Sequence, residues 1–172
     1  MPLEADKLME FLAIVDKELK EPVELTAVGG TAMTLLGLKD STIDIDFDVE
    51  TKHLERFRKT LESISHGYTI DLFHGGMVFS QQLPQDWTDK RIPIKRGFKN
   101  IRLYALHPLD IVVSKIGRLN DRDISDIRSC IKKHNLTKQR IKSRAKRVEY
   151  VGNDENYKAN LKYVIENLYS ED

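Results

Sequence analysis

The chain has 172 residues, a length typical of one domain or of one domain with a helical extension. Apolar residues make up 40% of it and charged residues 32%, so it can bury a core beneath a well-solvated surface. Its single cysteine, Cys130, excludes a disulfide framework and a cysteine-rich zinc site within one chain. Isoleucines surround Cys130 at helical spacing, which predicts a buried thiol. The acidic N-terminus and the absence of an apolar run of about 18 residues predict a cytoplasmic protein with no membrane partner.

Helices and strands alternate in the first part of the chain. Apolar residues at helical intervals predict an amphipathic helix over residues 6–20. A buried strand over 23–28 ends in Gly29-Gly30, after which Thr31 could cap a short helix. The other elements predicted before residue 107 are a strand over 42–49, a helix from Thr51 to about 64, strands within 68–73, 77–80, 91–96 and 101–106, and a loop over 81–89.

From Pro108 onward the pattern is helical throughout. The predicted helices are 108–119, 122–134 with Asp121 as its cap, 138–150 with Thr137 as its cap, and a last one from about 155. This order predicts an α/β (α+β) fold. Residues 1–106 would form a small mixed-sheet core, and residues 107–172 would form a helical region packed on it.

In the segment "TIDIDFDV", Asp44, Asp46 and Asp48 alternate with large apolar residues. On a strand these three side chains share one face. Adjacent like charges repel each other, and aspartate has a low strand propensity, so a merely solvated face explains the pattern poorly. Carboxylate oxygens are the ligands that hard divalent cations prefer. The pattern therefore predicts that a metal cation lies among these aspartates.

The Gly-Gly turn precedes this strand by a short distance. A strand that enters a helix through such a turn presents free backbone N–H groups, which suit a phosphate. Turns of this kind also serve strand-to-helix packing alone. Together with the acidic strand, however, the turn predicts a metal–nucleotide site in which Gly29, Gly30 and Thr31 bind the nucleotide.

The stretch "GGTAMTLLGLKDSTIDID" resembles the signature of the nucleotidyltransferase superfamily, which includes DNA polymerase beta, the CCA-adding enzymes and the small MNT proteins. Its spacing is most similar to that of the AbiE-type toxin enzymes and their uncharacterised relatives. The resemblance implies Mg²⁺ or Mn²⁺ at Asp44 and Asp46, and an NTP as substrate. The superfamily pattern does not require Asp48, which is interpreted as a strand-end residue. It also implies a third carboxylate on a later strand that completes the metal site and helps to activate the attacking hydroxyl. Asp71, in "YTIDLF", matches that position.

AbiE-type enzymes also carry an Asp-x-x-x-x-Lys motif and a further aspartate. Here "DIVVSK" supplies Asp110 and Lys115, and "RDISDI" supplies Asp123 or Asp126. Lys115 lies within or beside the buried stripe of its helix, where an ammonium group must reach outward or meet an anion. We therefore expect Lys115 to contact the triphosphate.

The roles of the other residues in these motifs stay open. Asp110 falls in the first turn of its helix, where a carboxylate meets the helix dipole favourably, so structural and functional roles are balanced. Asp123 and Asp126 could equally stabilise the start of their own helix. Arg122 is a candidate phosphate contact beside them.

The segment 128–147 contains nine lysines and arginines and no acidic residue. The rest of the chain then carries 19 basic and 27 acidic residues, a net charge of −8. Lysines and arginines one turn apart on a helix repel each other, which an acidic partner would relieve, although a solvated helix is an alternative. The predicted partner is tRNA or another RNA, bound through Lys138, Arg140, Lys142, Arg144, Lys146 and Arg147.

These features predict a metal-dependent nucleotidyltransferase that moves an NMP from an NTP to a hydroxyl of tRNA, a protein or a small molecule. The AbiE resemblance implies a toxin of a toxin–antitoxin pair, with an antitoxin protein as partner. One alternative is a catalytically inactive nucleotide- or RNA-binding module on the same fold. A haloacid-dehalogenase-like phosphatase also uses an Asp-x-Asp, but there no glycine turn precedes it.

Overall fold

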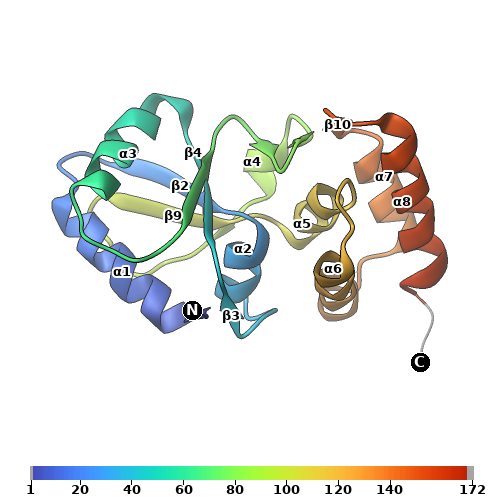
Figure 1. The fold of residues 1–172 in the computed structure, drawn as a ribbon, viewed down its shortest axis with the longest axis horizontal. Coiled ribbons are helices and arrows are strands. Elements are labelled where there is room, and N and C mark those ends of the chain that lie inside the picture. The colour runs from blue at the N-terminus through green and yellow to red at the C-terminus, as the bar shows by residue number, and fades with distance from the viewer. Residues whose placement is uncertain (1, 170–172) are drawn as a thin grey trace. The chain divides into compact units, whose positions relative to one another are not determined.

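The computed structural model describes residues 2–169, which form two compact units (Figure 1). The first unit contains the residues up to 75 and residues 91–106, and the second contains residues 76–90 and the chain from 107 onward. Compared with the predicted division into 1–106 and 107–172, residues 76–90 are grouped with the second unit. The domain division and its packing stay predictions. None of the helices in the described part has the length and apolar character needed to cross a bilayer.

A mixed five-stranded sheet forms the centre of the first unit, as predicted. Its order is β5 (Ile70–Phe73), β4 (Ile45–Val49), β2 (Val23–Ala27), β9 (Ile101–Ala105) and β8 (Ile92–Pro93). The pairs β2–β9 and β4–β5 are parallel, whereas β2–β4 and β8–β9 are antiparallel. A short antiparallel ribbon of β1 (Leu3–Glu4) and β3 (Ser41–Thr42) adds to the unit.

The two faces of this sheet differ in polarity because side chains alternate along each strand. One face is apolar and meets the helices α1 (Ala5–Glu18) and α3 (Leu54–Glu62), the second of which follows the 3-10 turn η1 (Thr51–His53). Phe57 of α3 packs edge to face against Phe47 of β4, with 6.4 Å between the ring centroids. The register places Glu24, Thr26 and the acidic residues of β4 on the opposite, polar face.

The helix α2 (Gly29–Leu35) follows β2 directly, and its two glycines have separate causes. Gly29 has a φ of +54°, a conformation that side chains disfavour. A Cβ at Gly30 would come within 2.9 Å of the Thr42 hydroxyl oxygen, so this position must stay small for α2 to approach β3. Thr31, expected to cap α2, lies inside the helix instead, and its hydroxyl bonds to β4 and the bend before it.

The second unit is mainly helical, but it also contains a three-stranded antiparallel sheet. The sheet has the order β10 (Glu149–Tyr150), β7 (Gln81–Gln82) and β6 (Met77–Val78). The helices are α4 (Trp87–Lys90), α5 (Pro108–Lys115), α6 (Asp121–His134), α7 (Lys138–Ala145) and α8 (Asp154–Asn167). Cys130 of α6 is buried, as predicted, and burial raises the pKa of its thiol to about 12.

Several predicted elements are wrong in their extent. The loop expected over 81–89 contains β7 and most of α4, and the helix expected over 108–119 ends at Lys115. The strand expected over 42–49 breaks at Ile43 and Asp44, because the hydroxyls of Thr42 and Thr31 both donate to the Asp44 carbonyl and bend the chain there. Ile43 is consequently exposed and not in the core. The helix expected over 138–150 ends at Ala145, after which β10 takes its backbone hydrogen bonds from β7.

Some predicted helix caps are also wrong, while others are confirmed. Asn120, and not Asp121, caps α6, since its side chain accepts from the N–H of Asp123. The helix expected to begin at Thr51 starts as a 3-10 turn without a side-chain cap. Thr137 caps α7 and Pro108 occupies the first turn of α5, both as predicted.

Asp16 of α1 ties the first helix to the start of β9. Its carboxylate accepts hydrogen bonds from the N–H groups of Lys99, Asn100 and Ile101, at 2.9, 2.6 and 2.9 Å. We expect Asp16→Ala to lower the free energy of unfolding by about 3 kcal/mol, because these N–H groups would lose a charged acceptor. Urea denaturation followed by circular dichroism measures this. Asp6→Ala, at an exposed position of the same helix, is the control, and equal losses in both variants would contradict the assignment.

His107 caps α5 with its ring, whose Nδ1 accepts from the N–H of Leu109 at 3.0 Å. Burial lowers the pKa of His107 below its ordinary value near 6.5. The neutral ring is therefore favoured in the folded state, and its contribution to stability is complete above pH 6.5 and is lost as the pH falls below that value.

Asparagine caps a helix without titrating, so His107→Asn should flatten the decline in stability between about pH 6.5 and 5. The difference in slope should approach 1.4 kcal/mol per pH unit at most, as estimated for one proton. Denaturation midpoints measured across this range test the expectation. Ser65→Asn, at an exposed loop position, changes no titratable group and should leave the slope unchanged.

Candidate functional site

Aspartates from two neighbouring strands meet on the polar face of the first unit's sheet. In the parallel pair β4–β5, Asp46 and Asp71 are direct register partners. Their side chains therefore leave the same face, on strands about 4.8 Å apart. Asp46 is buried, with 7% exposure, whereas Asp71 is exposed. Two carboxylates at this spacing can share a cation whose oxygen ligands lie at about 2 Å.

Asp44 has a different setting from Asp46, although both belong to the Asp-x-Asp motif. It precedes β4, in the bend between β3 and β4, and it is exposed. Its carbonyl oxygen is fixed by the hydroxyls of Thr42 and Thr31, at 2.7 and 3.1 Å. The backbone of Asp44 is thus held firmly beside the strand, while its carboxylate remains accessible.

The Gly29-Gly30 turn lies directly beside Asp46. The N–H of Val28, the residue before the turn, donates to the Asp46 carbonyl at 3.1 Å. The N–H of Asp46 donates to the Thr31 hydroxyl at 2.9 Å. The structure therefore brings together the glycine turn and the acidic strand that the sequence predicted to be neighbours. Because the Thr31 side chain is fully buried and its hydroxyl makes both contacts with the acidic segment, its direct role is to position that segment.

Asp48, interpreted from the sequence as a strand-end residue, lies within β4 and is buried with 3% exposure. Its register partner in β2 is Thr26, on the same polar face. Sequence reasoning also missed Arg91 there. The Arg91 Nη1 donates to Glu24 Oε1 at 2.7 Å and to the Thr26 hydroxyl at 3.1 Å, and its guanidinium lies 4.0 Å from the Tyr104 ring centre. No local motif marks Arg91, because its partners come from strands distant in sequence.

Asp71 also lines a hollow at the edge of the sheet. The hollow has a volume of about 420 Å³ and is bordered by Arg58 and Glu62 of α3 and by His66 and Tyr68 of the following loop. The rings of His66 and Tyr68 are stacked, with an interplanar angle of 15°. Ile70 and Leu72 also line the hollow, which lies on the α3 side of β5, whereas the Asp71 side chain leaves the opposite, polar face.

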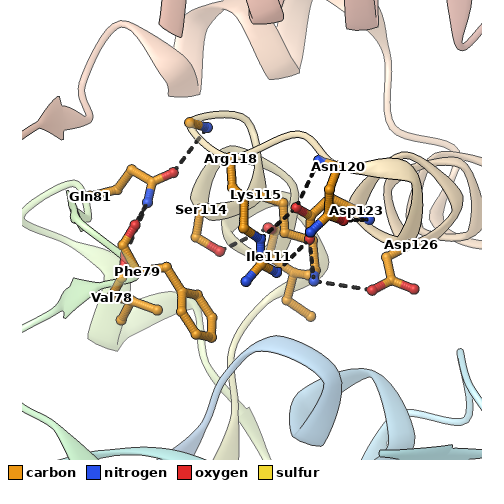
Figure 2. A network of polar contacts seen from close by, with 11 residues as sticks. Val78, Phe79, Gln81, Ile111, Ser114, Lys115, Arg118, Asn120, Asp123 and Asp126 are labelled. Carbon is orange, nitrogen blue, oxygen red and sulfur yellow. Dashed lines mark hydrogen bonds and ion pairs between the residues drawn. The ribbon is translucent and has the colours of Figure 1, made fainter. Parts of the chain in front are cut away.

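Lys115 lies in a buried ion-pair network of the second unit, shown in Figure 2. Its Nζ is 3.4 Å from Asp123 Oδ1 and 3.1 Å from Asp126 Oδ2. Arg118 forms a bidentate pair with Asp123 through Nε and Nη2, both at 2.7 Å. Burial acts to raise the pKa of Asp123, but Arg118, Lys115 and the Asn120 N–H hold it below its ordinary value. The positive charge of Lys115 is therefore already neutralised by carboxylates of its own unit.

Asp110 belongs to a separate ion-pair group of the second unit. It is completely buried and accepts from Arg144 Nε and Nη2 at 2.6 and 2.9 Å. Arg144 also donates from Nη1 to Asp86 at 2.7 Å, and Arg147 reaches the same carboxylate at 3.1 Å. Arg144 therefore lies inside this unit and off the exposed basic surface on which the sequence placed it. The exposed basic residues in and next to α7 are Lys138, Arg140, Lys142, Lys146 and Arg147.

The other predicted residues divide between the two units. Asp44, Asp46, Asp71 and the glycine turn come together in the first unit, while Lys115, Asp123 and Asp126 come together in the second. Arg122 is exposed in the first turn of α6. Sequence reasoning missed Arg118 and Asn120, although the spacing of Asn120 and Asp123 is that of a capping box.

Within residues 2–169, no three histidine, cysteine, aspartate or glutamate side chains converge to form a metal cage. Mg²⁺, however, is usually held by one or two carboxylates together with substrate phosphates and waters. The register pair Asp46–Asp71, with Asp44 just before it, supplies hard oxygen donors of this kind. The donors therefore fit a cation that arrives with a nucleotide better than one held permanently by the protein.

The fold and the geometry of the site are consistent with the protein family that the sequence matches. A family model described as a nucleotidyltransferase of unknown function (DUF6036) matches residues 6–170. No curated protein matches the chain. A solved structure of an antigenic nucleotidyltransferase-like protein from Paracoccidioides brasiliensis is similar, with 17% identity over 77% of this chain and 78% of that chain and a TM-score of 0.46. The finer assignment to the AbiE type stays a prediction. Because the family model spans nearly the whole sequence, the chain belongs to the DUF6036 family of nucleotidyltransferases of unknown function.

Proposed function

We propose that this chain is a metal-dependent nucleotidyltransferase that transfers an NMP from an NTP to an acceptor hydroxyl. The observation that carries the proposal is the register pairing of Asp46 with Asp71, beside a glycine turn that is hydrogen-bonded to Asp46 through Val28. Membership of the nucleotidyltransferase family supports the same reaction class. An inactive nucleotide-binding module has less support, because grouping these aspartates on one face is unfavourable unless a cation binds there.

In such a reaction, the residues of the first unit would have separate roles. Asp44 and Asp46 would hold Mg²⁺ or Mn²⁺, and the backbone at Gly29 and Gly30 would face the triphosphate. When bound, the cation neutralises phosphate charge as the acceptor approaches. Asp71, beside Asp46 on the polar face, would complete the metal site and would accept the proton of the acceptor hydroxyl there. The acceptor oxygen forms a bond to the α-phosphorus, the bond from that phosphorus to the bridging oxygen breaks, and pyrophosphate leaves.

The central test follows a label from the α-phosphate. Each α-labelled NTP is incubated with Mg²⁺ and the protein, with or without bulk tRNA, and the label is traced to RNA, protein or small molecules. We expect Asp44→Ala with Asp46→Ala to lower transfer about a hundredfold or more, because both proposed metal ligands are lost. Asp40→Ala, at an exposed aspartate before β3, is the matched control. Transfer that persists in the double variant would overturn the site.

The same assay separates the remaining alternatives. Asp71→Asn should lower the transfer rate about a hundredfold while leaving nucleotide binding within a few-fold, because asparagine keeps an oxygen that can face the cation but cannot accept the proton. Nucleotide binding by calorimetry without transfer to any acceptor would favour the inactive module. Label found on tRNA, together with growth arrest on expression that Asp44→Ala abolishes, would support the toxin role and the RNA partner that the AbiE resemblance implies.

Lys115 is tested separately because two carboxylates surround it. Lys115→Met should lower the free energy of unfolding by about 3 kcal/mol, since it removes one cation from a buried charge network. Adding Asp126→Leu should restore part of the loss, because an apolar pair can replace a buried ion pair. Urea denaturation measures both effects, and unchanged stability in Lys115→Met would contradict the network. In the restored variant, a tenfold higher KM for the NTP would support the predicted triphosphate contact, whereas an unchanged KM would limit Lys115 to the network.

A further inference from the structure

A groove lies between α7 and α8, entirely within the second unit. Its volume is about 310 Å³, and its apolar floor comes from Leu161 and the largely buried Ile165 of α8, with Glu166 as the one acidic residue of its described lining. Lysine side chains border this floor, and their hydrocarbon stems extend its apolar surface. The lysines are Lys142, Lys146, Lys158 and Lys162. An apolar floor with a basic border is therefore available on this surface.

The positive charge around the groove is poorly compensated. Lys142 and Lys146 are one turn apart at the end of α7, and Lys158 and Lys162 are one turn apart on α8, so each pair repels. Lys158 lies 3.8 Å from Glu155, and Lys162 lies 3.9 Å from Glu166. These ion pairs are exposed and contribute little in water. A ligand that brings carboxylates to the border would lower the repulsion.

We propose that this groove binds an acidic amphipathic helix of a partner protein. Such a helix can place apolar side chains from successive turns on the floor while its acidic side chains meet the lysines. RNA fits less well, because proteins that bind single strands combine basic grooves with aromatic rings, and the described lining contains none. Phosphates would also leave the Leu161 and Ile165 surface unused. The proposal does not depend on nucleotidyl transfer, since the groove residues are distinct from the aspartates of the first unit.

Fluorescence anisotropy with defined probes tests the proposal on the full chain. The first probe is a labelled helix of about 18 residues made of leucine, glutamate and alanine, with the leucines on one face. The second has the same composition with the leucines distributed around the helix. Oligouridine of similar length and bulk tRNA are the RNA probes. At about 0.15 M salt we expect the amphipathic peptide to bind at least tenfold more tightly than the second peptide and oligouridine, and we expect it, unlike tRNA, to depend on the groove residues.

Matched variants locate the binding surface. Leu161→Ser, which removes part of the floor, and Lys142→Glu with Lys162→Glu, which reverses charge at the border, should each weaken peptide binding at least tenfold. Ile14→Ser, at an exposed apolar position of α1, and Lys132→Glu with Lys133→Glu, at exposed positions of α6, should leave it within twofold. Thermal denaturation shows whether each variant is folded. If Leu161→Ser does not fold, the double variant Lys142→Glu with Lys162→Glu provides the test. Equal binding of both peptides, tighter binding of either RNA that the groove variants weaken, or groove variants that match their controls would overturn the proposal.

Discussion

The buried hydroxyl of Thr31 connects the two backbone segments on which the candidate site depends. It donates to the carbonyl of Asp44 and accepts from the N–H of Asp46, so both ends of the Asp-x-Asp motif are fixed to the helix that follows the glycine turn. Gly30 allows this helix to approach closely, because any larger side chain would meet Thr42. The spacing between the turn and the acidic strand is thus set by hydrogen bonds inside the core and does not rely on a ligand.

The two units differ in how their acidic side chains are compensated. In the first unit, aspartates share one face of a sheet, an arrangement that repulsion disfavours unless a cation intervenes. In the second unit, buried carboxylates are matched by basic side chains, as in the pair Asp110–Arg144 and in the network around Asp123. Buried ion pairs add little net stability, but they favour one arrangement of the helices, because any other would leave a charge unpaired. The first arrangement suits binding, and the second suits a fixed scaffold.

Local patterns in the sequence were sufficient for the features that depend on neighbouring residues. The first helix, the glycine turn, the buried Cys130 and the cap at Thr137 follow from spacing and residue type. The break in the strand at Ile43 and Asp44 could not be predicted from such patterns, because it arises from the hydroxyls of Thr31 and Thr42, which both donate to the Asp44 carbonyl. Strict alternation of apolar and acidic residues continues through the break, so periodicity alone predicts one long strand.

Contacts between distant segments account for the remaining differences. In the sequence, Arg144 is one of many basic residues in its segment. In the structure it is buried, because it forms ion pairs with Asp110 and Asp86. The end of α7 likewise depends on β7, which lies far away in sequence and offers β10 a partner. The side-by-side placement of Asp46 and Asp71 is also a matter of strand register, whereas their identity as candidates came from the motif. In each case the residue type is visible in the sequence, but its neighbours depend on contacts between segments that are distant in sequence.

The grouping of residues 76–90 with the later helices means that the polypeptide passes from one unit to the other three times. A fragment starting at residue 107 would lack the strand that pairs with β10 and the carboxylate of Asp86 that Arg144 contacts. During synthesis, the hairpin of β6 and β7 must wait for about 65 further residues before its third strand emerges, at ribosomal rates of about 5–20 residues per second. The helical half is therefore not a module that can be cut away or exchanged at a single junction.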